Sequence, residues 1–151
     1  MWAVYVVAGF SPRSTMGTKH HRLPRECYRR RVCASFTLCV EERKWFFVSS
    51  DMIQVFLVCL DKVAEKYAFR AIYCFMPDHL HLIALGNSDN TDLLRAVEEF
   101  KQRTGYWLHK HPPFVYWQKS FYDPIIRANE LVAHVNYVLD NPMRWGCRRL
   151  A

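Results

Sequence analysis

The stretch from Phe75 to Ala84 (FMPDHLHLIA) constrains the fold of this chain most, because polar side chains interrupt an apolar run at a spacing of two residues. Side chains of a β-strand alternate between its two faces. A strand that begins at His79 would therefore project His79 and His81 from one side. Leu80 and Leu82 would then enter a packed layer on the other side.

Two imidazoles that lie two residues apart, on the same face of a strand, can supply two ligands of a divalent-metal site. A third ligand would have to come from elsewhere in the chain. Imidazole suits zinc, copper and nickel, and also manganese or magnesium. The alternative interpretation is a strand whose histidines merely face the solvent. Other motifs in the sequence are needed to choose between a metal-binding pair and a solvent-facing pair.

The composition indicates one folded domain with a basic surface. With 151 residues, 51% hydrophobic and 15% aromatic, the chain is long and apolar enough to bury a core. Its net charge of +7 fits a polyanionic partner, either nucleic acid or an acidic membrane surface. Aromatic residues among the arginines favour single-stranded nucleic acid, because bases stack on them. A merely soluble basic protein is the alternative.

The cysteines and the apolar segments indicate a cytoplasmic protein. The six cysteines form no Cys-x-x-Cys pair and no short disulfide framework, and several lie in apolar runs, as buried thiols do. No apolar run reaches the length of a transmembrane helix. Residues 1–10 are apolar but short and lack a basic leader, so a signal peptide is not expected. Met16 is an alternative start.

We expect an N-terminal basic, flexible arm over residues 1–25 and a folded domain over residues 26–151. The polar stretch 11–31 is rich in turn formers and arginines, which predicts a flexible or loosely docked segment. A solvated tail without function is the alternative.

The domain is predicted to be α+β. A tight connection at Pro77–Asp78 makes two neighbouring strands an antiparallel hairpin. The element order predicts a split βαβ (ferredoxin-like) antiparallel sheet with both first helices on one face and the histidine pair on the open face. The predicted elements are a strand over 32–40, a helix from 49–51 to about 67, strands over 69–76 and 79–85, a helix capped by Thr91 or Asp92 and closed by 109–113, extended segments over 114–118 and 121–126, and a last helix, capped by Asn129, over about 130–140 that Asn141-Pro142 stops.

The last predicted helix carries a candidate nucleophile. Tyr137 and Asn141 are four residues apart and so share a helix face. A nearby cation can favour the phenolate of a tyrosine and can polarise a phosphate oxygen as a Lewis acid. Tyr137 could then attack phosphorus and form a covalent ester. The alternative is a half-buried tyrosine with no chemical role.

Three motifs in this order resemble one family. The first is His79-Leu80-His81, a His–hydrophobe–His (HUH) signature within Met-Pro-Asp-His-Leu-His-Leu, the second is Trp-Gln-x-x-Phe-Tyr-Asp-x-Ile-Ile-Arg over residues 117–127, and the third is Tyr137-x-x-x-Asn141-Pro. Over about residues 22–146, the chain resembles the REP-associated tyrosine transposases. These are domesticated, insertion-sequence-200-like members of the single-tyrosine HUH transposases.

The resemblance implies roles for four residues. His79 and His81 would be metal ligands for Mg²⁺ or Mn²⁺, Asn141 would be the third ligand, and Tyr137 would be the nucleophile. Asp140 is an alternative ligand, although it lies on a different helix face.

The family cleaves single-stranded DNA at hairpins or palindromes through a 5′-phosphotyrosine and leaves a free 3′-hydroxyl, which can reverse the step. The resemblance therefore implies single-stranded or hairpin DNA as partner. It also implies a monomer or homodimer, no membrane, and a location at the bacterial nucleoid. On charge alone, the candidate DNA-binding residues are Arg29, Arg30, Arg31, Lys101, Arg103, Lys119 and Arg127.

Other residues compete for these roles. Tyr122 is the chief rival nucleophile. His109 and His111 form a second His-x-His pair, but a charged central residue and the following prolines favour a surface loop. His134, one turn before Tyr137, either tunes the tyrosine or is a plain helix histidine. At the level of function, the alternatives are a catalytically idle hairpin-binding module and a small metallohydrolase that uses the pair with water.

Overall fold

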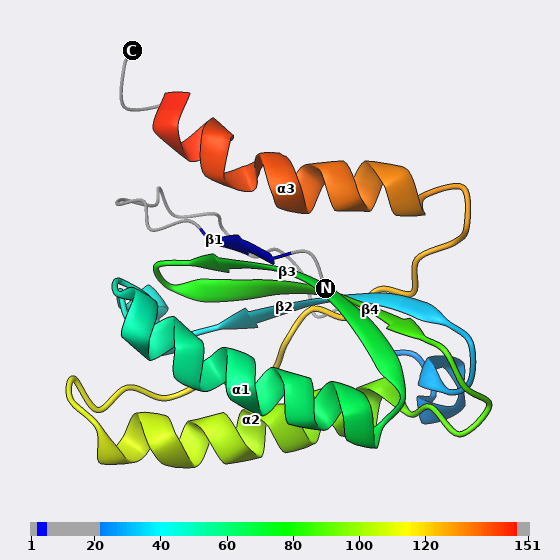
Figure 1. Ribbon diagram of the computed structural model, residues 1–151, viewed down its shortest axis with the longest axis horizontal. Helices are drawn as coiled ribbons and strands as arrows, with labels where there is room; N and C mark the ends of the chain where they lie inside the picture. The colour runs from blue at the N-terminus through cyan, green and yellow to red at the C-terminus, as the bar shows by residue number, and fades with distance from the viewer. Residues whose placement is uncertain (1–2, 6–21, 148–151) are drawn as a thin grey trace.

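The computed structural model describes the backbone of residues 3–5 and 22–147, and the side chains of residues 22–140. A four-stranded sheet in the order β1-β3-β4-β2 has helices α1 and α2 on one face and α3 on the other (Figure 1). The strands are β1 (Ala3–Tyr5), β2 (Cys33–Cys39), β3 (Phe69–Met76) and β4 (His79–Gly86); the helices are α1 (Ser50–Lys66), α2 (Leu93–Lys110) and α3 (Leu131–Cys147), and the short 3-10 helices are η1 (Arg25–Tyr28) and η2 (Glu41–Arg43).

The predicted α+β arrangement is confirmed. The strands predicted over 32–40, 69–76 and 79–85 are β2, β3 and β4. Ser49 caps α1 and Asp92 caps α2, each by accepting a hydrogen bond from the backbone N–H three residues later, at 3.4 and 3.0 Å. Short polar side chains satisfy the unpaired N–H groups of a first helical turn, so these residues mark where the helices begin.

The sheet has the predicted split βαβ connectivity. β3 and β4 form an antiparallel hairpin, and β2 pairs antiparallel with the other edge of β4. The chain that follows α2 returns beside β2 and forms isolated bridges there: Trp117 with Val40, Tyr122 with Thr37, and Ile125 with Ala34. The extended structure predicted for this segment is present, but it is reduced to separate bridges. Pro124 in the segment has no N–H to donate to a ladder.

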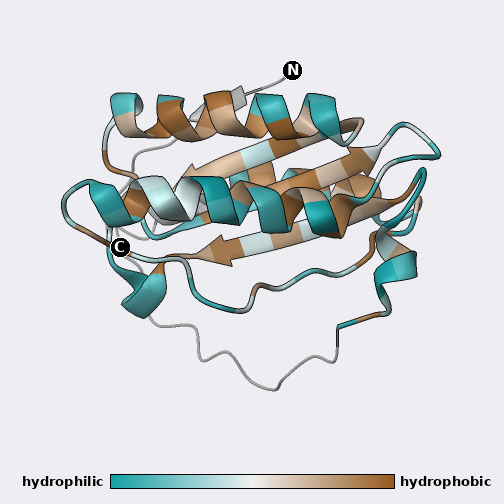
Figure 2. Ribbon diagram, turned by 90° about the horizontal axis from the view of Figure 1, so that it is seen from below, coloured by the Kyte–Doolittle hydropathy of each residue, from teal (hydrophilic) through white to brown (hydrophobic). Residues whose placement is uncertain are grey.

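The main core lies between the sheet and helices α1 and α2. Leu80 and Leu82 of β4 are fully buried there, as the alternation of the strand predicts. Aromatic rings fill much of this layer; the Phe47 ring centroid lies 5.0 Å from that of Phe75 and 5.1 Å from that of Phe56. Figure 2, seen from the side of the two helices, shows hydrophilic segments along α1 and α2 and mostly hydrophobic strands behind them.

The prediction of an open sheet face is wrong, because α3 covers it. Cys74 and Met76 of β3 and Ile83 of β4 pack in a second buried cluster with Val138 of α3, which is 1% exposed. The central strands are apolar on both faces, and such strands need a packed layer on each side. The helix that carries the candidate nucleophile provides the second layer.

The end of α3 differs from the prediction. The helix was expected to stop at Asn141-Pro142, but it continues to Cys147. A proline removes one backbone donor and usually ends or kinks a helix, yet some helices pass through it. The start of the helix is close to the prediction, at Leu131, and the Glu130 carboxylate accepts a hydrogen bond from the Arg127 N–H at 3.0 Å.

The N-terminal region contains one strand that the sequence did not predict. Residues 3–5 form β1, which pairs in parallel with β3. Residues 6–21 of the predicted arm lie outside the described residues. Arg22 and Arg25 contact the domain, through ion pairs with Asp123 at 2.6 Å and with Glu98 at 2.8 Å. The boundary at residue 25 stays a prediction.

None of the helices among the described residues combines the length and the apolar character needed to cross a bilayer. The described cysteines are free thiols, at positions 27, 33, 39, 59 and 74. Burial raises the pKa of the Cys74 thiol to about 11, so this thiol stays protonated at neutral pH.

A close backbone approach at Gly86 gives the first testable prediction. A Cβ atom at this position would overlap with the carbonyl oxygen of Arg30. The substitution Gly86→Ala would therefore push the backbone at residue 30 or residue 86 out of its position. We expect a loss of about 1–3 kcal/mol in the free energy of unfolding, measured with urea. The control is Gly105→Ala in α2, where the nearest atom is 3.6 Å away and a helical alanine stabilises by about 1 kcal/mol. A stable Gly86→Ala variant would contradict this packing.

Candidate metal and nucleophile site

The two histidines of β4 lie together on the α3 side of the sheet, as predicted, but they are buried. Their relative exposures are 6% for His79 and 7% for His81, which excludes a pair that faces solvent. In the sheet register, His81 lies between Thr37 of β2 and Cys74 of β3. The pair is therefore part of the second packed layer.

The ring nitrogens of the pair converge. His79 Nε2 lies 3.0 Å from His81 Nε2, and the ring planes are nearly perpendicular. Two nitrogens bound at about 2.1 Å to one cation, at an angle near 90°, would lie about 3.0 Å apart. The outer nitrogens are also occupied, because His79 Nδ1 contacts Asp78 at 2.5 Å and His81 Nδ1 contacts Thr37 Oγ1 at 3.2 Å. This donor set and its outer hydrogen bonds fit a divalent metal.

The protonation state of His81 also suits a metal ligand. Burial, together with His79 and Arg43, lowers the pKa of His81 to about 3, so its imidazole is neutral at neutral pH. Only a neutral imidazole can give a nitrogen lone pair to a metal.

Asp78 places a charge next to the pair. Its side chain is fully buried, and its Oδ2 has no hydrogen-bond partner among the described residues. The compensating charge is Arg43, whose Nε lies 2.8 Å from Oδ2 without the geometry of a hydrogen bond. Since a buried charge is costly unless it is paired, Arg43 belongs to the site.

The described side chains contain no cluster of three His, Cys, Asp or Glu residues that could hold a metal. A third protein ligand to a metal held by the histidine pair would therefore have to be another residue type or lie outside the described side chains. Asn141, the predicted third ligand, belongs to α3 by its backbone, but its side chain lies outside the described residues. Asp140, the alternative ligand, is exposed.

Tyr137 is the tyrosine that lies next to the pair. Its ring centroid is 5.8 Å from that of His81, in an edge-to-face arrangement. The side chain is 48% exposed, so a large substrate can reach it while it contacts the buried pair. An accessible phenol beside two converging imidazoles can serve nucleophilic substitution at a phosphate held by a cation.

The rival tyrosine has a different environment. Tyr122 is bound to the edge strand by its backbone, where its carbonyl oxygen accepts a hydrogen bond from the Thr37 N–H at 2.9 Å. Its side chain is 45% exposed. Exposure therefore does not separate the two tyrosines, and the ring contact with His81 favours Tyr137.

The other candidate histidines do not join the pair. His109 is exposed and its Nδ1 contacts the Tyr116 hydroxyl at 2.8 Å. His111 is also exposed and stacks on Trp107 with ring centroids 4.1 Å apart. Their predicted surface position is confirmed, but the predicted loop is wrong for His109, which lies in the last turn of α2. His134 lies partly buried on α3.

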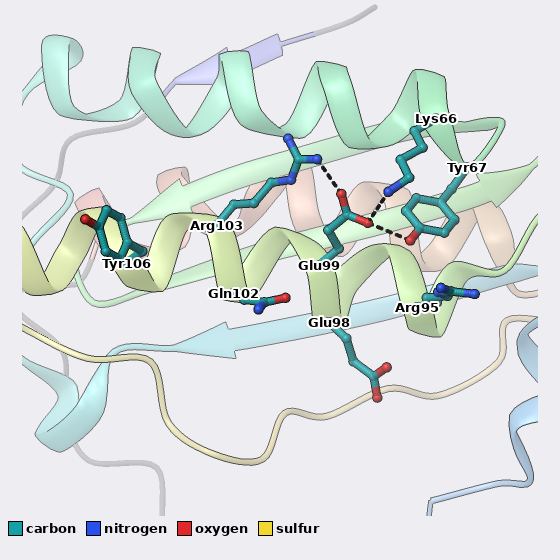
Figure 3. A pocket seen from close by; sticks show the side chains of 8 residues that line it. All are labelled: Lys66, Tyr67, Arg95, Glu98, Glu99, Gln102, Arg103 and Tyr106. Carbon is teal, nitrogen blue, oxygen red and sulfur yellow. Dashed lines mark hydrogen bonds and ion pairs between the residues drawn. The ribbon is translucent and has the colours of Figure 1, made fainter.

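Two predicted DNA-binding residues on α2 are engaged within the protein. The ammonium of Lys101 donates to the carbonyl oxygens of Gln118 at 2.7 Å and Lys119 at 3.2 Å. Burial lowers the pKa of Lys101 to about 8. Arg103 pairs with Glu99 at 2.6 Å in a hollow between α1 and α2, on the sheet face opposite the histidines (Figure 3).

The remaining basic candidates lie on the surface. Arg29 and Arg31 pair with Asp92 at 3.3 Å and with Asp89 at 3.5 Å, next to the start of α2. Arg30, Lys119 and Arg127 are exposed. The role of these residues in DNA binding stays a prediction.

Sequence reasoning missed two residues of the site. Thr37 comes from β2 and Arg43 from η2, and each contacts the site across a sequence separation of more than thirty residues. The strand alternation of 32–40 would have placed Thr37 on one of two faces, but no signal indicated its register with His81. No local signal indicated Arg43.

Comparisons with known proteins were made for both the sequence and the fold. The sequence model of the family "Transposase IS200 like" matches residues 29–141, which is most of the chain. A Haemophilus influenzae protein described as a REP-associated tyrosine transposase is 26% identical in an alignment of 124 residues. The match covers 74% of this chain and 70% of the relative.

Two solved structures share the fold. One is a REP-associated tyrosine transposase bound to a REP hairpin, with a TM-score of 0.69 and 20% identity over 86% of this chain and 75% of the other. The second is a transposase from Deinococcus radiodurans, with a TM-score of 0.52 and 16% identity over 83% of this chain and 98% of the other. Because the family model matches residues 29–141, which is most of the chain, this protein belongs to the IS200-like transposase family.

Proposed function

We propose that this protein is a metal-dependent single-strand DNA endonuclease and strand transferase. The observation that carries the proposal is the contact between Tyr137 and His81, whose Nε2 lies 3.0 Å from that of His79. α3 and β4 are separate elements, yet they bring an accessible phenol to two converging imidazoles. This is the arrangement that a tyrosine nucleophile and a metal-held phosphate require.

In the proposed reaction, the Tyr137 oxygen forms a bond to phosphorus and loses its proton to solvent. The bond from phosphorus to the 3′ oxygen breaks, and that oxygen leaves as a hydroxyl after it takes up a proton. The products are a 5′-phosphotyrosine and a free 3′-hydroxyl. Attack of a 3′-hydroxyl on the phosphotyrosine reverses the step and joins strands.

His79, His81 and Asn141 would hold the metal, Mg²⁺ or Mn²⁺. When bound, it would neutralise charge on the phosphate and polarise a phosphate oxygen. The protein's own residues fix the geometry, because Asp78 and Thr37 occupy the outer nitrogens of the pair and hold both rings.

The proposed substrate is hairpin DNA with an unpaired flank. The solved relative bound to a REP hairpin supports this choice, as does the net charge of +7. A flexible, unpaired strand can bring a phosphate to the half-exposed side chain of Tyr137. A pool of hairpin oligonucleotides with randomised single-stranded flanks is a suitable probe, because it requires no knowledge of the target sequence.

If the histidine pair holds a metal, removal of one imidazole should abolish DNA cleavage. We expect His81→Ala to reduce the covalent protein–DNA adduct about a thousandfold or more on a denaturing gel, and to abolish Mn²⁺ binding measured by calorimetry. Because His81 is buried, some loss of stability is also expected, and circular dichroism must show a folded variant. His109→Ala, at an exposed histidine, is the matched control. Undiminished adduct in excess EDTA would refute the metal role.

The nucleophile prediction compares two tyrosines of similar exposure. Tyr137→Phe removes only the hydroxyl, so we expect folding and hairpin binding to persist while the covalent adduct disappears. Tyr122→Phe should form the adduct at the wild-type rate. Peptide mapping of the wild-type adduct identifies the residue directly. Hairpin binding without adduct formation by the wild type, under all metal conditions, would instead favour the idle binding module.

The substrate prediction concerns strand form and salt. We expect the adduct with hairpins that carry unpaired flanks and none with blunt duplex of the same sequence. The logarithm of the binding constant should fall linearly with the logarithm of salt concentration, by about 0.7 for each single-strand phosphate contacted. Filter binding between 50 and 200 mM salt, as an approximate range, measures the slope. Equal reaction with blunt duplex would contradict the proposed substrate.

A further inference from the structure

The segment between α2 and α3 places Tyr122 on the same face of the sheet as the histidine pair. Tyr122 forms a bridge with Thr37 of β2, and Thr37 is the register partner of His81 in β4. Side chains of directly opposite residues in an antiparallel pair lie on the same face. Because the Thr37 hydroxyl contacts His81 Nδ1, all three side chains belong to the α3 side of the sheet.

The neighbours of Tyr122 support this orientation, because both lie toward the main core. The Phe121 ring packs against that core, with its centroid 5.9 Å from that of Phe36. Arg22 lies 4.3 Å over the same Phe121 ring and pairs with the Asp123 carboxylate. In extended backbone successive side chains alternate, so Tyr122 points away from the main core.

The backbone that carries Tyr122 is held on both sides. Its carbonyl oxygen accepts the hydrogen bond from the Thr37 N–H at 2.9 Å. The ammonium of Lys101 binds the carbonyl oxygens of residues 118 and 119 and lies 4.8 Å from the centroid of the Phe121 ring. The Tyr122 side chain therefore extends from a fixed position beside the sheet.

His81, Thr37 and Tyr122 form a row across the sheet that becomes more accessible toward its edge. Exposure is 7% at His81, intermediate at Thr37 and 45% at Tyr122. Tyr137, which contacts the His81 ring, is also half-exposed. The face of the sheet thus presents two accessible tyrosines, one at the histidine pair and the other at the outer end of the row.

The two tyrosines suit different parts of an unpaired nucleotide. In the proposed reaction the phosphate lies at Tyr137, and the sugar and base extend away from it. Adjacent strands are about 4.8 Å apart, so the Tyr122 backbone lies about 10 Å from that of His81. An aromatic ring offers a flat apolar surface on which any base can stack, whereas an ionised phosphate cannot.

We propose that Tyr122 is a substrate-positioning residue, whose ring stacks on a base of the unpaired strand next to the phosphate that Tyr137 attacks. The inference rests on the proposed function, because it requires an unpaired strand at this site. Stacking would also select against duplex, since paired bases are covered by their own neighbours. A merely structural Tyr122 would cover the edge of the sheet without contacting DNA.

A photochemical crosslink tests the contact directly. The probe is the pool of hairpins with randomised flanks, with 5-iodouracil in place of thymine in the flank only. Irradiation joins this base to an aromatic ring that stacks on it, and peptide mapping identifies the residue. The Tyr137→Phe variant is used, so that no phosphotyrosine adduct forms. We expect the crosslink at Tyr122. Hairpin binding with crosslinks only at other residues would overturn the inference.

Variants at Tyr122 test what the ring contributes. Tyr122→Ala should weaken binding of flanked hairpins by about 5- to 100-fold, the usual effect of removing one stacked aromatic ring. Binding of the same hairpins without a flank should not change, which a general loss of structure would not reproduce. Tyr122→Phe keeps the ring and should retain wild-type binding.

Two further variants separate stacking from packing. Tyr122→Leu keeps apolar bulk at the sheet edge without an aromatic ring, so it should fold even if Tyr122→Ala does not, and it should show the same weakened binding. Tyr106→Ala is the matched control, because Tyr106 is an exposed tyrosine beside the hollow on the opposite face of the sheet (Figure 3). It should leave binding unchanged.

The outcomes distinguish this inference from the proposed function. Wild-type affinity for flanked hairpins in folded Tyr122→Leu, with the adduct still formed at Tyr137, would overturn the inference alone. Absence of both hairpin binding and adduct in the wild type would contradict the proposed function, and the inference with it.

Discussion

The two-residue period of β4 is the constraint on which the rest of the structure depends. Leu80 and Leu82 are fully buried toward α1 and α2, so His79 and His81 must face the opposite layer. A shift of one residue in register would send both histidines into the main core and the two leucines into the layer beneath α3. The energy of the main core therefore holds the candidate metal ligands in place, although none of its residues takes part in the chemistry.

α3 has two roles that cannot be separated. Val138 closes the second apolar layer against Cys74, Met76 and Ile83, and the same docking brings Tyr137 to His81. The position of the candidate nucleophile is therefore set by the burial of an apolar helix face. Its half-exposed side chain leaves room for a substrate at the edge of that layer.

The polar groups of the site, Asp78, His79, His81 and Thr37, are surrounded by this apolar layer. Asp78 is fully buried, and a buried carboxylate is costly unless a charge compensates it. Arg43 provides that charge from a strained turn, and the histidines connect Asp78 to Thr37. Such an arrangement contributes little to stability compared with apolar side chains of similar volume, which is consistent with a functional reason for its presence.

Features that depend on near neighbours along the chain could be predicted from the sequence. Alternation predicted His79 and His81 on one face, and cap-forming residues at 49–51 and 91–92 indicated where two helices begin. The resemblance to the transposase family indicated Tyr137 as the candidate nucleophile. Contacts between distant segments could not be predicted in this way. They include the sheet face that α3 covers, the contacts of Arg43 with Asp78 and of Thr37 with His81, the hydrogen bonds of Lys101 to backbone carbonyls, and the pairing of residues 3–5 with the sheet. The physical reason is that periodicity and capping act within a few residues. Burial of apolar faces and compensation of a buried charge instead depend on which distant segments meet, and local patterns do not encode that.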